Sequence, residues 1–182
     1  MRKFLLSLSV VAMAVAAIGL AGCKAKEKEQ EATVTSYIEG ATEADMSGYN
    51  TINSNDCFME ITVDQLLNAI SQKDTNAIVY IGYTQCENCQ SAIVAIQDAA
   101  RDLNQTVYYL DTAKSIQSDV DYDRLFDALK PILVSMDKDN PDDIGLYTPH
   151  VFKIENGELV QGHVGYTEGY DYTADMTFGK VA

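Results

Sequence analysis

Between residues 57 and 166, short apolar runs alternate with amphipathic stretches, and this alternation predicts the element order β-α-β-α-β-α-β-β. The most apolar run, 77–83, is too short for a helix and is rich in β-forming residues, so we expect a strand buried on both faces. Behind it, apolar residues from Ile93 to Leu103 recur on one face of a helix. The pattern therefore predicts an α/β fold around a buried strand.

Local signals place the other elements of this region. We expect a strand at 57–61, a helix from the capping box Thr62–Gln65 to about Lys73, a strand at 106–111, a loop at 112–120, a helix at 122–136 bent or split by Pro131, an acidic loop at 137–143, and two strands around Asn156-Gly157. The acidic loop lacks the glycine and the terminal glutamate of a calcium-binding EF-hand, so it is interpreted as a solvated loop.

Two cysteines, Cys86 and Cys89, lie where the buried strand gives way to the helix. Unpaired N–H groups at a helix N-terminus favour negative charge, and the thiolate is the attacking species in disulfide exchange. Cys86 is therefore the expected nucleophile. Cys89, one helical turn further, is close enough to form a disulfide with Cys86 and to resolve a mixed disulfide.

The same cysteine spacing also occurs in zinc sites, which normally require a second pair of ligands. The remaining candidates, Cys57, His150 and His163, form no second paired motif, so redox chemistry is favoured and neither a metal nor an organic cofactor is expected. We interpret Cys57 as a small buried core residue, and His150 as a surface histidine beside a strand.

Residues 1–22 resemble a bacterial lipoprotein signal peptide. Two basic residues precede an apolar run, and Leu20-Ala21-Gly22-Cys23 matches the lipoprotein box. The resemblance implies a mature protein that begins at a lipidated Cys23 and is anchored in the cell membrane on its extracytoplasmic face. Residues 23–55, which are charged and polar with few large apolar side chains, are expected to be a flexible linker.

The whole chain has a net charge of −14, and removal of residues 1–22 leaves 11 basic and 27 acidic residues, net −16. Such a surface argues against binding to nucleic acid and against direct adsorption to anionic lipid. The lipid anchor, rather than the protein surface, is therefore expected to hold the protein at the membrane.

The order of these features resembles the thioredoxin family over residues 56–166. The resemblance is carried by Cys86 and Cys89 after a buried strand, by Thr148-Pro149 before a hairpin, and by Val164-Gly165 late in the last strand. It implies a three-layer sandwich with a mixed central sheet. It also implies a cis-proline at Pro149 beside the cysteines, and docking of substrate peptide on the backbone of Thr148. Within the family, the chain looks most like the bacteriocin-transport accessory proteins.

The chain departs from the thioredoxin pattern at several positions. Tyr80 stands where thioredoxins have a buried acid, Gln85 stands in place of a tryptophan, and Glu87-Asn88 stands between the cysteines in place of Gly-Pro. Residues 167–182 show no apolar helical stripe, so the final helix is expected to be lacking and the tail irregular.

The expected function is that of an exported, membrane-tethered thiol–disulfide oxidoreductase. Its partners would be exported protein thiols and disulfides and a redox partner protein. Two alternatives stay open, namely a redox-inert accessory protein of an export or bacteriocin system, and a copper-handling protein that uses Cys86 and Cys89 as soft ligands. Because Glu87 adjoins the nucleophile and Arg101 is the only basic residue between 77 and 104, we expect a potential toward the reducing end.

Overall fold

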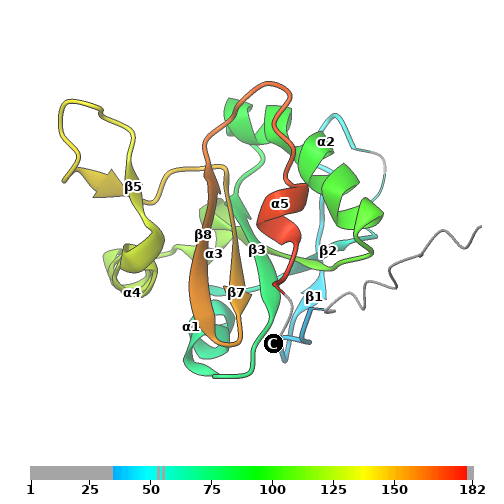
Figure 1. Ribbon diagram of the computed structural model, residues 1–182, viewed down its shortest axis with the longest axis horizontal. Helices are drawn as coiled ribbons and strands as arrows, with labels where there is room; N and C mark the ends of the chain where they lie inside the picture. The colour runs from blue at the N-terminus through cyan, green and yellow to red at the C-terminus, as the bar shows by residue number, and fades with distance from the viewer. Residues whose placement is uncertain (1–34, 53, 55, 180–182) are drawn as a thin grey trace, which may run out of the picture. The chain divides into compact units, whose positions relative to one another are not determined.

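The computed structural model describes residues 35–52, 54 and 56–179, and in it a mixed six-stranded sheet lies between two helical layers (Figure 1). Across the sheet the strands follow the order β1 (Thr42–Glu43), β2 (Phe58–Glu60), β4 (Val107–Asp111), β3 (Ala77–Gly82), β7 (His150–Glu155) and β8 (Glu158–Val164). Strands β2, β4 and β3 are parallel, and the remaining pairs are antiparallel. The predicted α/β sandwich with a mixed central sheet is confirmed.

Helices cover both faces of this sheet. The helical segments are α1 (Val63–Ser71), α2 (Glu87–Asp102), α3 (Thr112–Ser115), α4 (Asp119–Leu129), a 3₁₀ turn η1 (Lys130–Ile132) and α5 (Thr173–Met176). Side chains of α1 and α4 pack with one face of the sheet, and those of α2 and α5 pack with the other. A separate hairpin of β5 (Val134–Ser135) and β6 (Ile144–Gly145) follows η1.

Strand β3 is buried along its whole length, as its apolar run predicts. Successive side chains of a strand point to opposite faces, so Val79 and Ile81 pack with α1 and α4, while Ile78 and Tyr80 pack with α2. Each large apolar side chain buried in this way contributes about 1.5–3 kcal/mol to stability. The most apolar stretch of the sequence thus becomes the centre of both halves of the core.

Two local predictions are confirmed by their backbone geometry. The Thr62 hydroxyl accepts the Gln65 N–H at 3.2 Å, and the Gln65 side chain accepts the Thr62 N–H at 2.8 Å, which completes the capping box of α1. Asn156 and Gly157 have φ angles of 52° and 77°, as a type I′ turn between β7 and β8 requires.

The segment between β4 and β5 differs from its prediction. Residues 112–115, expected in a loop, form α3, because the Asp111 carboxylate accepts the Ala113 N–H at 3.0 Å and so caps a short helix directly after β4. Helix α4 begins at Asp119 because Ser118 caps it, and it ends at Leu129 because Pro131 favours a 3₁₀ turn there.

The described part of the expected linker packs onto the domain. Strand β1 pairs antiparallel with β2, and Tyr49 is only 1% exposed in the core beneath α2. The apolar residues of this segment are few and irregularly spaced, so they show neither a helical nor a strand period. The folded part of the chain therefore begins well before residue 56.

The C-terminal tail also differs from its prediction. Residues 173–176 form the four-residue helix α5, and Tyr172 and Met176 are buried against the core that contains α2. Because α5 makes only about one turn, it leaves no apolar period that a sequence pattern could reveal.

The predicted signal peptide 1–22, the lipidation site Cys23 and residues 24–34 lie outside the described residues, so the lipid anchor stays a prediction. Among the residues that the structure describes, no helix is both long and apolar enough to cross a membrane.

We predict that Tyr49→Ala lowers the free energy of unfolding by about 3 kcal/mol, because it empties a fully buried aromatic site. The matched control is Tyr37→Ala, in the same segment but 73% exposed, which should cost less than about 0.5 kcal/mol. Urea unfolding followed by circular dichroism measures both values. Equal, small losses would mean that this segment is a linker after all.

Candidate functional site

The site is built on the junction between β3 and α2. Cys86 is the N-cap residue of α2, with an extended backbone, and its Sγ accepts the Cys89 N–H at 3.2 Å. The sulfur thus takes one of the backbone donors that a helix start leaves unpaired. The Cys86 sulfur therefore lies at the N-terminal end of the helix dipole, in contact with a backbone donor.

Thr148 faces Cys86 from across the site. The Thr148 hydroxyl donates to the Cys86 Sγ at 3.6 Å, and the Cys86 thiol lies 3.8 Å from the Thr148 carbonyl oxygen, to which it donates when protonated. The Thr148–Pro149 peptide bond is cis, as the resemblance implied, and the Pro149 carbonyl accepts the Gly165 N–H at 2.7 Å. Four of the residues singled out from the sequence, Cys86, Cys89, Thr148 and Pro149, therefore lie together.

The two thiols of the pair differ in their surroundings. Cys89 is fully buried, and burial together with the hydrogen bond to Cys86 raises the pKa of the Cys89 thiol. Cys86 is also largely buried, but it lines an open groove of about 630 Å³. A disulfide in this groove could be reached by Cys86, whereas Cys89 lies one turn inside and could reach only a sulfur already bound to Cys86.

Gln90 holds the loop before Cys86 in place, a role that the sequence did not suggest. Its side-chain NH₂ donates to the carbonyl oxygens of Thr84 and Gly48, at 2.6 and 2.8 Å, and its side-chain oxygen accepts the Asn50 N–H at 3.0 Å. The first turn of α2 is thereby tied to the segment that was expected to be a linker. Because all these partners are backbone groups, no residue pattern could have indicated them.

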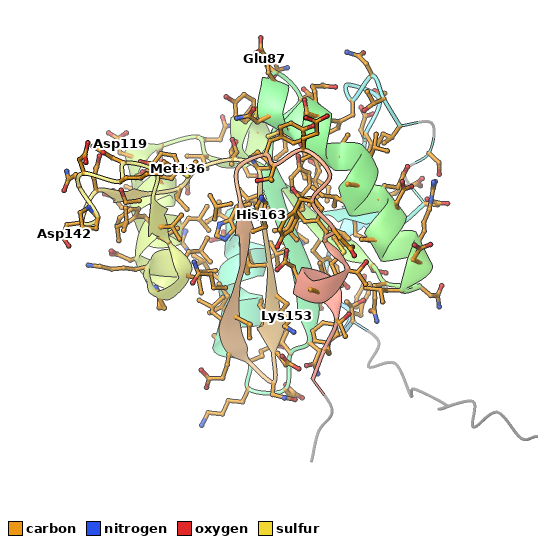
Figure 2. The ribbon with its side chains drawn as sticks, turned by 45° about the horizontal axis from the view of Figure 1, so that its top comes forward. Glu87, Asp119, Met136, Asp142, Lys153 and His163 are labelled. Atoms are coloured by element: carbon orange, nitrogen blue, oxygen red, sulfur yellow. The ribbon has the colours of Figure 1, made fainter. Side chains whose placement is uncertain are left out.

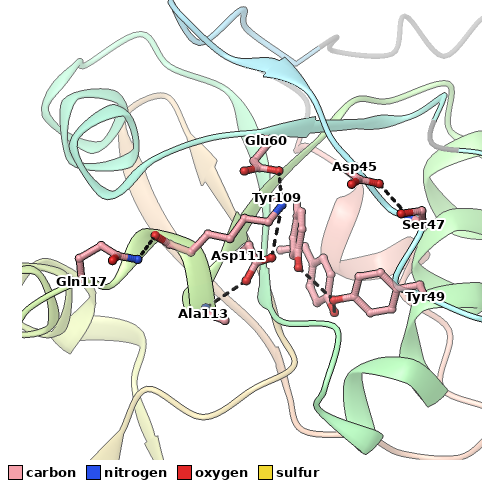
Figure 3. A network of polar contacts seen from close by, with 10 residues as sticks. Asp45, Ser47, Tyr49, Glu60, Tyr109, Asp111, Ala113 and Gln117 are labelled. Atoms are coloured by element: carbon pink, nitrogen blue, oxygen red, sulfur yellow. Dashed lines mark hydrogen bonds and ion pairs between the residues drawn. The ribbon is translucent and has the colours of Figure 1, made fainter.

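A group of buried tyrosine hydroxyls lies in the same core cluster as the cysteine pair (Figure 3). The Tyr49 hydroxyl is 2.8 Å from that of Tyr80 and donates to that of Tyr109 at 3.3 Å. Burial raises the pKa of all three hydroxyls, so they stay neutral. At Tyr80 this core therefore holds a hydrogen-bonded hydroxyl, where the resemblance described above implied a buried acid in other members of the family.

This network continues toward the surface through Asp111. The Asp111 carboxylate lies beside the Tyr109 hydroxyl and raises its pKa further. Lys114 pairs with Asp111 at 3.7 Å and with Glu60 at 3.0 Å (Figure 3). The first charged group of this network is thus separated from Tyr80 by two tyrosine hydroxyls.

The two histidines do not join the cysteines. His150 is 1% exposed, so its interpretation as a surface histidine is wrong. In β7 it lies on the same face as Phe152, whose ring is 5.0 Å away, and that face packs with α1 and α4. His163 stacks on Tyr170 at 3.7 Å. Within the described ranges no three His, Cys, Asp or Glu side chains gather as a metal site would require.

Cys57 is buried, as predicted, and burial raises the pKa of its thiol to about 11. It precedes the N-terminal end of β2, whereas Cys86 follows the C-terminal end of β3. Both strands run parallel to β4, so the two cysteines lie toward opposite ends of the sheet. This separation places Cys57 outside the site.

Comparison of the chain with protein-family models gives no match, and comparison with curated proteins gives none either. What the site can do therefore follows from its own geometry.

We predict that iodoacetamide alkylates Cys86 much faster than Cys89 or Cys57 in the reduced protein at pH 8. Cys86 receives backbone and side-chain donors beside an open groove, whereas the other two thiols are buried and their pKa values are raised. Mass mapping of the alkylated peptides measures the three rates, and labelling in guanidinium supplies the unfolded reference. Equal rates in the folded protein would contradict the assigned division of roles.

We predict that His150 makes the folded protein less stable as the pH falls from about 6.5 to 4. Burial, with His163 contributing, lowers the pKa of His150 to about 4, so over this range the unfolded chain binds a proton that the folded chain does not. The loss should reach about 3 kcal/mol and level off below pH 4. Urea unfolding of the wild type and of His150→Phe isolates this contribution, and two parallel pH profiles would refute it.

Proposed function

We propose that the protein is an exported, lipid-anchored, thioredoxin-like thiol–disulfide oxidoreductase that acts on the disulfides of other exported proteins. The observation that carries this proposal is the position of Cys86, which caps α2, accepts the Cys89 N–H, and faces Thr148 beside cis-Pro149. The likeness to bacteriocin-transport accessory proteins and the tether at Cys23 belong to the same proposal and rest on the sequence.

In the first step the Cys86 thiolate attacks one sulfur of a partner's disulfide. A Cys86–partner S–S bond forms and the partner's own S–S bond breaks. The second partner sulfur leaves as a thiolate and takes a proton from water. This step is an exchange, so a single disulfide is conserved and no outside oxidant is needed.

In the second step Cys89 resolves the mixed disulfide. Its thiol gives up a proton, its sulfur attacks the Cys86 Sγ, and the first partner sulfur is released as a thiolate. The partner has then gained two electrons and become a dithiol, while Cys86 and Cys89 have become a disulfide. A dithiol on a redox partner protein restores the reduced pair by the same two exchanges in reverse.

Thr148 would hold the partner in the first step. Its backbone would pair with an extended segment of the partner in the manner of an added β-strand, which sets the partner's sulfur beside Cys86. The contacts between Thr148 and the Cys86 Sγ, at 3.6 and 3.8 Å, support this arrangement.

The potential of the pair is proposed to lie toward the reducing end. Strong oxidants owe their potential to heavy stabilisation of the reduced thiolate. Here Glu87 follows Cys86 directly, and Lys153, which could have folded in to compensate, instead pairs with Glu155 at 3.3 Å and lies far from Glu87 in Figure 2. The nearby charge therefore opposes the thiolate.

The test is reduction of insulin by dithiothreitol in the presence of the full-length protein in neutral detergent. We expect the protein to accelerate precipitation of the insulin B chain. Cys86→Ser should return the rate to that of dithiothreitol alone, because the attacking sulfur is lost. Cys89→Ser, reduced beforehand and freed of dithiothreitol before insulin is added, should accumulate a mixed disulfide through Cys86, visible on a non-reducing gel, because the resolving thiol is lost.

The matched control is Cys57→Ala, which removes a buried thiol toward the other end of the sheet and should leave the rate unchanged. A wild-type protein that gives no acceleration would overturn the proposal and favour the redox-inert or copper-handling alternatives. Full activity in Cys86→Ser would overturn the assigned nucleophile.

A further inference from the structure

The groove beside Cys86 has a wall of aromatic and aliphatic side chains. The groove is lined by Tyr83 and residues of the β3–α2 loop, by Ile116, which follows α3, and by Tyr122 of α4. Tyr147 lines the groove as well. Its ring packs against Gly145 of β6 so closely that a Cβ added to this glycine would lie 3.0 Å from the ring. Side chains of this kind bind apolar groups without fixing their hydrogen bonding.

Some exposed apolar side chains belong to the segments that line or adjoin this groove. Six large apolar side chains are exposed in the described part of the chain, and four of them belong to segments that border the site, namely Val120, Tyr122, Met136 and Tyr166. Met136 lies against Gly165, 3.4 Å from where a Cβ would be, and Gly165 donates its N–H to the Pro149 carbonyl. Exposed apolar side chains next to a groove are typical of an interaction surface.

Acidic residues are frequent in the segment that leaves the groove at Tyr122 and returns to it at Leu146. Between residues 119 and 143 there are eight aspartates and three basic residues, and one of these, Arg124, is neutralised by Asp64 at 2.7 Å. Asp119 and Asp142 lie on the same side of the domain as Met136 in Figure 2. Among the described residues that line the groove, Glu87 is charged and no lysine or arginine is present.

Resting on the proposed thiol–disulfide exchange, we propose that the groove selects cationic partner segments. Such a segment would be extended, would carry lysine or arginine near its cysteine, and would place an aromatic or long aliphatic side chain next to that cysteine. The apolar side chain would lie against Tyr122 and Tyr147. Basic groups on the two sides of the cysteine would point in different directions, one toward Glu87 and the other toward the aspartates of the β5–β6 hairpin, which lie apart from Glu87 in Figure 2. Charge complementarity of this kind raises the association rate and disfavours acidic partners.

The probes are short synthetic peptides with one central cysteine, each supplied as a disulfide-linked homodimer. The basic, neutral and acidic versions differ only in flanking Lys, Gln or Glu, and a further basic version replaces the neighbouring Phe by Ala. Reduction by the full-length reduced protein is followed by acid quenching and chromatography. Each rate is divided by the rate with dithiothreitol, which removes differences in the intrinsic reactivity of the disulfides.

We expect the basic peptide to react about tenfold faster than the neutral one at low ionic strength, with the acidic peptide slowest. The difference should largely disappear in about 0.5 M sodium chloride, where charges are screened over a few ångströms. The version with Ala should react more slowly than the version with Phe, and Tyr122→Ser should reduce this second difference without changing the first.

Two charge-neutralised variants locate the effect. The hairpin variant converts the four aspartates of the β5–β6 hairpin to asparagine, namely Asp137, Asp139, Asp142 and Asp143. The control variant removes the same amount of charge away from the groove, by the corresponding amide substitutions at Asp74, Asp98, Asp102 and Glu158. The hairpin variant should lose most of the preference for the basic peptide, while the control variant should keep it. Equal losses in both would show that net charge alone is responsible and would overturn the proposal.

Two further results would also overturn it. Equal normalised rates for the basic and neutral peptides, with insulin still reduced, would refute the selectivity and leave the proposed function intact. Failure to reduce both the peptides and insulin would refute the proposed function, and the selectivity with it. Sedimentation at the assay concentration provides the last check, since a dimer that dissociates in the hairpin variant would mean that a second copy of the chain fills the groove.

Discussion

The site depends on one constraint, the fixed start of α2 at the end of β3. Strand β3 is paired with β4 on one side and β7 on the other, and every residue in it is buried, so its C-terminal end cannot shift without disrupting both halves of the core. A short turn follows, in which the Cys86 N–H donates a hydrogen bond to the Tyr83 carbonyl oxygen at 3.2 Å. This turn places Cys86 at the N-terminus of α2. Burial of an apolar run thus fixes a thiol among backbone donors.

A second layer of support comes from the segment before β2. Tyr49 fills the core beneath α2 and links the hydroxyls of Tyr80 and Tyr109, while the backbone at Gly48 and Asn50 meets the side chain of Gln90. These contacts join the segment nearest the expected membrane anchor to the turn that carries Cys86. A change in this segment would therefore alter the site. A change in an ordinary linker would alter only the distance between the site and the membrane.

The sequence was most informative where one local signal decided the structure. The apolar run of β3, the capping box at Thr62 and the Asn156-Gly157 turn each act over a few residues, and each was predicted correctly. The packed N-terminal segment and α5 were missed because their stability comes from contacts with distant residues, which leave no periodic pattern. His150 was misjudged for the same reason, since the burial of its side chain depends on the layers packed around β7.

Charge and burial are arranged differently inside and outside the site. Beside the cysteines the core holds neutral tyrosine hydroxyls, and the nearest charges of that network are Asp111 and Lys114, which also pairs with Glu60. The groove outside carries Glu87 and the acidic hairpin beyond it. The Cys86 sulfur therefore faces backbone and hydroxyl donors inside the site, while the carboxylates outside it lie on the surface, where salt screens their charge. A cationic partner that docked in the groove would neutralise those carboxylates and so reduce their repulsion of the negatively charged sulfur during the attack.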